Sequence, residues 1–203
     1  MFSLKNALMA RRIRTERNNT FERLFGLGAK ALRQTYCDSG SRSLRQPDIA
    51  YPAVQNLAEV GINAFFAQFQ VRESDAAPLA QAATHGYEPA GGAAYSKVTG
   101  GAHFRIHLSR TPKFAGVVVS LVSDDVEVFH RIAEHRIPPP APWTVFTHLD
   151  PLELGPLQGD VAYWWRQFWR PFWNSLSATE RGVYLISNNA SADWAACVRF
   201  HST

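Results

Sequence analysis

The chain has 203 residues, of which 46% are hydrophobic and 12% aromatic, so it can bury a sizeable core and is not disordered as a whole. Two cysteines, Cys37 and Cys197, exclude a disulfide framework and fit a reducing compartment, although one bridge between them stays open. No apolar run approaches the roughly 20 residues that span a bilayer, and the N-terminus lacks the apolar segment of a secretory signal. We therefore expect a cytoplasmic protein without a transmembrane segment, with a mitochondrial presequence as the alternative for the first 18 residues.

Charge is distributed unevenly along the chain. Residues 1–45 hold ten Lys or Arg and three acids, a net charge of +7, whereas residues 46–203 hold 11 basic and 14 acidic residues, a net charge of −3. We predict a loosely packed basic helical arm and linker over residues 1–45, followed by a single α+β domain over residues 46–203. Such an arm suits nucleic acid, the anionic inner surface of a membrane or an acidic protein. The alternative is a solvated surface helix.

The first half of the chain favours helices. Residues 4–35 are expected to be helical, loosened by Gly26 and Gly28, and residues 37–48 resemble a linker. A strong helix is predicted from Pro52 to about residue 70, because apolar residues recur there at helical spacing. Ser74 is the expected cap of a short helix that runs to about Thr84.

The middle of the chain predicts a small sheet. The glycine-rich residues 86–101 are expected to form a loop. Residues 103–109 alternate between apolar and polar side chains, as a half-buried strand does, and residues 114–122 predict a more buried strand. The residues between them, 110–113, would connect the two as a hairpin. A helix is predicted over residues 124–136, started by Ser123, Asp124 and Asp125, and a short strand over residues 143–148.

An aromatic segment dominates the C-terminal part. Asp160 is the expected cap of a helix whose broad aromatic face predicts burial of Trp164, Trp165, Phe168, Trp169, Phe172 and Trp173, with Arg166 and Arg170 exposed. Pro171 lacks an N–H group and predicts a kink or a break. Ser177 and Glu180 form a capping box for a further helix, and Ser191 starts the last one. The whole pattern predicts an α+β fold, with a small mixed sheet flanked by N-terminal and C-terminal helices.

Candidate sites are few. His103 and His107 would share one exposed face of a strand, but no third ligand stands at a metal-binding spacing, so we predict no metal site. No cofactor is predicted either. The glycine-rich stretch from Gly91 to Lys97 lacks the Gly-Lys-Ser/Thr ending of a phosphate loop and is interpreted as a loop. Asp124 and Asp125 suit the start of a helix better than paired acid–base work.

Residues 129–136 concentrate two histidines, two arginines and one glutamate. Arg131 could give a phosphate two parallel hydrogen bonds, because the guanidinium group is planar and permanently charged. The alternative is a charged helix face on which these side chains pair with one another.

One family resemblance adds to this. Residues 158–198 resemble the C-terminal part of plasmid fertility-inhibition proteins of the Osa/FiwA type, through the segments Tyr163-Trp164-Trp165, Phe168-Trp169-Arg170-Pro171-Phe172-Trp173, Tyr184-Leu185 and Ala192-Asp193-Trp194. The resemblance implies a ParB/sulfiredoxin-like fold and a bacterial protein that blocks a type IV secretion coupling protein, and with it conjugative DNA transfer. It also implies ATPase and nuclease activities.

In that fold a Gly-x-His/Arg-Arg turn contacts the nucleotide. The nearest match here is Val128-Phe129-His130-Arg131, without the glycine, so His130 and Arg131 are the catalytic residues that the resemblance implies. We expect a cytoplasmic regulator that binds a protein partner and inhibits conjugation. The alternatives are an enzyme that hydrolyses nucleotide or DNA, and a nucleic-acid-binding module that uses the basic arm.

Overall fold

A computed structural model describes residues 18–41 and 45–202 of the chain. Residues 18–25 are helical and are followed by α2 (Ala29–Thr35) and the short 3-10 helix η1 (Cys37–Ser41). A six-stranded sheet follows, with strand order β1-β2-β6-β5-β4-β3. The five pairs of neighbouring strands are all antiparallel, which confirms the α+β class and corrects the expected mixed sheet.

The strands of the sheet are interrupted by two helices. The strands are β1 (Val54–Asn56), β2 (Phe65–Val71), β3 (Glu88–Pro89), β4 (Ala94–Thr99), β5 (Ala102–Lys113) and β6 (Gly116–Ser123). A 3-10 turn η2 (Ala58–Val60) lies between the first two strands, and α3 (Glu73–Ala83) and α4 (Val126–Glu134) follow β2 and β6. The C-terminal helices are α5 (Pro142–Val145), α6 (Gly159–Trp164), the π-helix η3 (Trp165–Trp169), α7 (Arg170–Ser175), α8 (Ala178–Ser187) and α9 (Ala192–His201).

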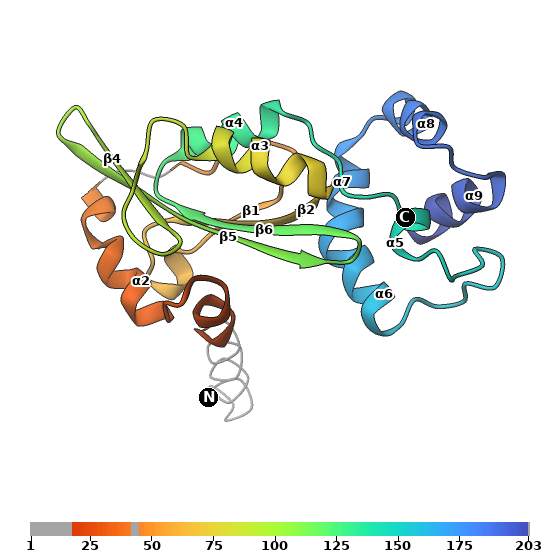
Figure 1. Ribbon diagram of the computed structural model, residues 1–203, viewed down its shortest axis with the longest axis horizontal. Coiled ribbons are helices and arrows are strands. Elements are labelled where there is room, and N and C mark those ends of the chain that lie inside the picture. The colour runs from red at the N-terminus through yellow and green to blue at the C-terminus, as the bar shows by residue number, and fades with distance from the viewer. Residues whose placement is uncertain (1–17, 42–44, 203) are drawn as a thin grey trace, which may run out of the picture.

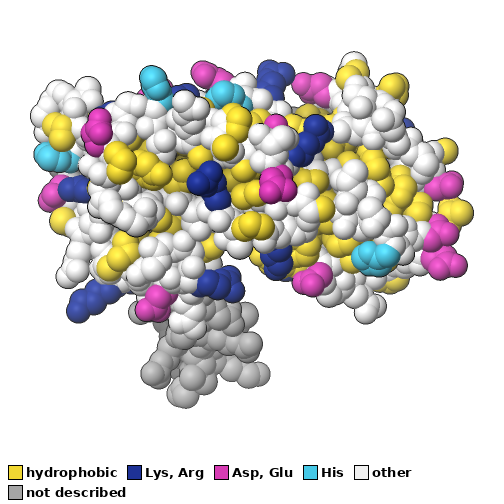
Figure 2. All heavy atoms as spheres, in the orientation of Figure 1, with side chains coloured by type: hydrophobic (Ala, Val, Ile, Leu, Met, Phe, Trp, Pro, Cys, Tyr) yellow, Lys and Arg dark blue, Asp and Glu magenta, His cyan; other side chains and the backbone are white. Residues whose placement is uncertain are grey.

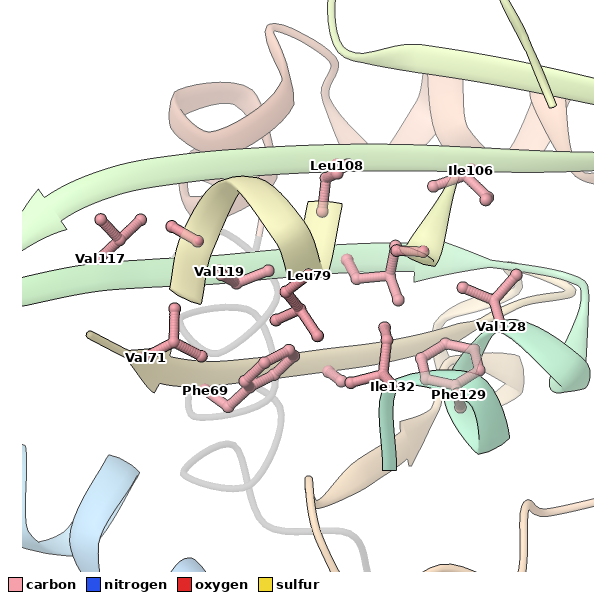
Figure 3. Packing of buried hydrophobic residues seen from close by; sticks show 14 of the residues in the cluster. Phe69, Val71, Leu79, Ile106, Leu108, Val117, Val119, Val128, Phe129 and Ile132 are labelled. Carbon is pink, nitrogen blue, oxygen red and sulfur yellow. The ribbon is translucent and has the colours of Figure 1, made fainter. Parts of the chain in front are cut away.

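Both faces of the sheet are covered. On one face α3 and α4 pack over alternate residues of β2, β5 and β6, and their side chains form a first core with Phe69, Val119 and Ile132 near its centre (Figure 3). The opposite face carries two separate cores. The N-terminal helices cover one end of that face, and the aromatic segment covers the other, as Figure 1 shows.

The described part of the basic arm is not loosely packed. Phe21, Leu32 and Tyr36 are buried in the core that the N-terminal helices share with Val122 of β6. The expected helix is confirmed over residues 18–35, with an interruption at Gly26 to Gly28. Residues 1–17 and 42–44 of the predicted arm, 20 of its 45 residues, lie outside the described residues.

The predicted helix over residues 52–70 is wrong, because the segment forms β1, η2 and β2. Its phenylalanines at positions 65 and 69 lie four residues apart, and this spacing places them on one face of a strand as well as on one face of a helix. Residues 67–71 do alternate between apolar side chains and two glutamines, as a strand does, but this alternation is confined to five residues and is preceded by two adjacent phenylalanines. Gly61, with φ 72°, ends the 3-10 turn in a left-handed conformation that interrupts any helix.

The expected loop over residues 86–101 contains β3 and β4. Its glycines form the turns between strands, and Gly91, Gly92, Gly100 and Gly101 all have positive φ angles. The hairpin of β5 and β6 is confirmed, but residues 110–113 continue the strand and pair with β6. The turn is instead Phe114 and Ala115, with φ angles of 54° and 53°, the mirror-image turn that suits the twist of a hairpin.

The C-terminal helices confirm most of the predicted pattern. The aromatic side chains predicted to be buried are buried, and Arg166 and Arg170 are exposed. The capping box of Ser177 with Glu180 and the Ser191 cap are both present. Gln158, and not Asp160, occupies the N-cap position of α6, without a capping hydrogen bond from its side chain. Residues 142–145 form the helix α5 and not a strand. At Pro171 the helix continues, and the expected irregularity is the wider π-helical turn of η3, next to the residue that lacks an N–H group.

A buried amide joins the aromatic segment to the sheet. Gln70 of β2 is fully buried, and its Oε1 accepts a hydrogen bond from the indole N–H of Trp164. Its Nε2 donates to the carbonyl oxygens of Lys113 (2.7 Å) and Phe114 (2.8 Å) at the turn of the β5–β6 hairpin. One side chain therefore fixes the hairpin and the aromatic segment relative to β2.

Over the described residues, none of the helices has the length and apolar character needed to cross a bilayer.

Candidate functional site

The two residues that the resemblance implies as catalytic lie on α4, on the side of the sheet that α3 also covers. Arg131 Nη1 donates a hydrogen bond to the carbonyl oxygen of His85 (2.9 Å), which follows the end of α3. Both His130 and Arg131 are half-buried. This contact joins α4 to the segment after α3, and it is not one of the pairings within residues 129–136 that the alternative expected. A catalytic role for His130 and Arg131 stays a prediction.

A polar cluster lies at the end of β6, where Asp124 and Asp125 connect β6 to α4. Asp125 is the N-cap of α4, and its Oδ1 accepts a hydrogen bond from the backbone N–H of Glu127 (3.1 Å). Its Oδ2 accepts hydrogen bonds from the hydroxyl of Tyr87 and from Lys97 Nζ (2.7 Å). Burial alone would raise the pKa of Asp125, but the hydrogen bonds from Lys97 and Tyr87 hold that pKa below its ordinary value.

Asp124 lies among residues from the N-terminal segment. Its Oδ1 accepts a hydrogen bond from the backbone N–H of Arg105 (2.7 Å), and its Oδ2 accepts one from the hydroxyl of Ser39. Burial raises the pKa of Asp124, and these hydrogen bonds oppose that rise. The expectation of helix-start duty is therefore confirmed for Asp125, whereas Asp124 connects η1 to β5.

His107 is buried on the same face of the sheet as the N-terminal helices. Its Nδ1 is hydrogen-bonded to the hydroxyl of Tyr36 (2.9 Å), which donates to the carbonyl oxygen of Val122 (3.1 Å). Burial, with a smaller contribution from the charge of Arg105, lowers the pKa of His107 to about 4. His107 is therefore neutral near pH 7 and serves to attach the N-terminal segment.

The expected pair of exposed histidines is wrong, because His103 is exposed but His107 is buried. Across residues 18–41 and 45–202, no group of three or more His, Cys, Asp or Glu side chains is placed to hold a metal ion. Lys97, at the end of the glycine-rich stretch, is held by Asp125 in an ion pair.

All four carboxylate oxygens of this cluster accept hydrogen bonds from within the protein. The cluster therefore fixes three parts of the chain to the end of β6: the N-terminal segment, the β4 strand and α4. Sequence reasoning did not find the contacts of Asp125 with Tyr87 and Lys97. Those residues lie 38 and 28 positions away, and no motif connects them.

A different feature marks the C-terminal helices. Among the described residues, six large hydrophobic side chains are exposed, and five of them fall between positions 152 and 200: Leu152, Tyr163, Val183, Ile186 and Phe200. The sixth is Val98 of β4. In the space-filling view, apolar side chains reach the surface at several places over the C-terminal helices (Figure 2).

Helix α8 carries the most exposed of these side chains. Val183 and Ile186 are 59% and 80% exposed, whereas their neighbours Tyr184 and Leu185 are buried in the aromatic core. Residues three apart lie on the same side of a helix, so Val183 and Ile186 form one apolar ridge that faces solvent. We call these two residues the α8 ridge.

Comparison with known proteins found no match to the chain among protein-family models, curated proteins or solved structures.

Proposed function

We propose that the chain is a bacterial regulatory protein that acts by binding another protein. The observation that carries this proposal is that five of the six exposed large apolar side chains among the described residues lie between positions 152 and 200, in the C-terminal part of the chain. A single exposed apolar residue needs no explanation, but several in one region favour an interaction surface. Ile186 of the α8 ridge is the most exposed of these side chains, at 80%, and Val183 lies beside it on the same helix.

The aromatic core gives the α8 ridge a rigid support. Tyr184 of α8 packs against Trp169, Phe172 and Trp173, with ring centroids 5.6, 5.2 and 6.5 Å away. The first turn of α8 is further held by its capping box. A helix fixed in this way loses little conformational entropy when a partner binds to its outer face.

We propose the coupling protein of a type IV secretion system as the partner, and inhibition of conjugative DNA transfer as the result. The support for this choice is the resemblance of residues 158–198 to fertility-inhibition proteins. The residues that carry this resemblance include the tryptophans of the aromatic core and Tyr184 and Leu185 of α8. Such a regulator would act in the bacterial cytoplasm.

The proposal is tested by measuring the affinity of the purified protein for a purified coupling protein by biolayer interferometry. The double variant Val183→Lys, Ile186→Lys places two charges on the α8 ridge, and we expect it to bind at least about tenfold more weakly, a loss of about 1.4 kcal/mol. The matched control is Val98→Lys, because Val98 is 62% exposed on β4, away from α8. Equal affinities for the wild type and the double variant, or an absence of binding by the wild type, would reject the proposal.

A further inference from the structure

A groove of about 260 Å³ lies where the C-terminal helices meet the α4 side of the sheet. Its residues come from three separate parts of the chain: the segment before β1, the end of α4, and the region from α7 to the first turn of α8. Ligand sites are frequently found where separate parts of a protein meet. The volume is below the roughly 300–1,000 Å³ that is typical for drug-sized ligands, so the groove suits a smaller molecule.

One wall of the groove is apolar. Ile49, Tyr51, Phe172 and Leu176 line it, and the rings of Tyr51 and Phe172 pack edge to face at 5.5 Å between centroids. Phe172 is itself part of the aromatic core, so this wall is rigidly held. A branched or aromatic hydrocarbon side chain of a ligand would be desolvated against these residues.

Two opposite charges also line the groove. Arg136 Nη1 and Glu180 Oε1 are 3.7 Å apart, and their side chains are 85% and 49% exposed. An exposed ion pair at this distance contributes little stability, so a ligand can replace it at small cost. The other carboxylate oxygen of Glu180, Oε2, accepts the capping hydrogen bond from the backbone N–H of Ser177 (2.8 Å), which fixes the position of Oε1.

The backbone at Arg136 has an uncommon conformation. Its φ angle is 46°, in the left-handed region where glycine or asparagine is usual after the end of a helix. An arginine there carries a conformational cost, and such costs are concentrated at functional sites. At this position the arginine places its guanidinium group opposite Glu180.

We propose that this groove binds a free apolar α-amino acid. The ligand's carboxylate pairs with Arg136, its ammonium group pairs with Glu180 Oε1, and its side chain lies among Ile49, Tyr51, Phe172 and Leu176. An amino acid carries both charges on adjacent groups next to a hydrocarbon side chain, which matches the two charges and the apolar wall. A fatty acid would leave Glu180 unpaired, and a simple amine would leave Arg136 unpaired. This inference is independent of the proposed function, since it needs no protein partner.

The test is isothermal titration calorimetry of the full chain with L-phenylalanine and L-leucine. We expect saturable binding of one molecule per chain, with a Kd between roughly a micromolar and a millimolar. N-acetyl-L-phenylalanine lacks the ammonium charge, phenethylamine lacks the carboxylate, and glycine lacks the side chain. Each of the three is expected to bind at least about tenfold more weakly than L-phenylalanine.

Two variants separate the charges from the fold. Arg136→Asn removes the charge and keeps a residue that tolerates a left-handed backbone, and Glu180→Gln removes the charge and keeps a capping-box residue. We expect both variants to lose at least about tenfold in affinity for L-phenylalanine while their Tm values stay near that of the wild type. The control Arg166→Gln removes an exposed arginine from η3 that does not line the groove, and it should bind as the wild type does.

Three results would overturn the inference. They are the absence of saturable binding of either amino acid up to about 10 mM, well above the weak end of the expected range, equal binding of the N-acetylated compound, and unchanged affinity in both groove variants.

Discussion

Replacing Gln70 by Met tests the connection between the sheet and the aromatic segment. Methionine has a length similar to that of glutamine and is apolar, so the change removes the amide group with little change in volume. In the wild type this amide accepts one hydrogen bond from Trp164 and donates two, to Lys113 and Phe114. The variant leaves the buried indole N–H of Trp164 and two carbonyl oxygens at the part-buried hairpin turn without these partners.

The expected loss of stability follows from these three contacts. A buried polar group that loses its partner costs roughly 1–3 kcal/mol. The two carbonyl oxygens can relax toward other donors, so each costs about 1 kcal/mol, at the lower end of that range. With roughly 1–3 kcal/mol for the indole N–H, the sum is about 3–5 kcal/mol. The matched control is Gln68→Met on the same strand and the same face. Gln68 is only half-buried and donates one hydrogen bond, to the hydroxyl of Ser120 (3.0 Å), so its replacement should cost about 1 kcal/mol or less.

The assay is urea-induced unfolding followed by tryptophan fluorescence, with the free energy of unfolding taken from the midpoint and slope. The aromatic core contains five of the chain's tryptophans in its buried part, so the signal reports directly on the affected region. We expect Gln70→Met to lower the free energy of unfolding by at least about 2 kcal/mol more than Gln68→Met does. Equal losses in the two variants would show that Gln70 does not hold the two parts together.

Other predictions address the sheet, pH and catalysis. At Gly116 a Cβ would lie 2.5 Å from a backbone oxygen of β2, so Gly116→Ala should lower Tm. At Gly182, inside α8, a Cβ would meet nothing within 4 Å, so Gly182→Ala should stabilise the protein by about 0.5–1 kcal/mol. A higher Tm for Gly116→Ala than for Gly182→Ala in thermal unfolding would contradict these expectations. His107 has a folded pKa of about 4 against 6.5 when unfolded, so the unfolded chain takes up this proton first. Its contribution to stability is lost as the pH falls from about 6.5 to 4, by up to about 3 kcal/mol, and a His107→Gln variant should lack this slope in pH-dependent unfolding. If the resemblance extends to catalysis, Arg131→Ala and His130→Ala should each abolish ATP or DNA hydrolysis by nuclease-free protein; equal rates in the two variants and the wild type would rule out a catalytic role.

Local signals in the sequence predicted three of the helix starts, whereas the expected caps Ser74 and Asp160 are wrong, because both residues lie inside the first turns of α3 and α6. The capping box of α8, the Ser191 cap of α9 and the Asp125 cap of α4 each depend on residues within three positions of one another, so a single sequence contains them. The burial of the aromatic segment was also predictable, since the angular arc of its side chains leaves only one orientation in which the arginines reach solvent.

Tertiary context decided the rest. Phe65 and Phe69 fit a helix and a strand equally well by spacing, and the local strand signal, the alternation of residues 67–71 between apolar and glutamine side chains, is only five residues long. The attachment of the N-terminal segment was missed for a similar reason, because Tyr36 reaches its partner His107 across 71 positions of sequence. The groove beside Arg136 likewise combines three distant segments, which no local motif in the sequence connects.

A mating assay tests the proposal that the α8 ridge is the surface by which this protein inhibits conjugation. Donor cells would express the wild type, the Val183→Lys, Ile186→Lys variant or the Val98→Lys control at equal levels, and the frequency of plasmid transfer would be counted. We expect the wild type and the control to lower the transfer frequency. We expect cells with the charged α8 ridge variant to keep most of the transfer frequency of cells without the protein. Transfer at the same frequency with and without the wild-type protein, or full inhibition by the charged variant, would contradict the claim.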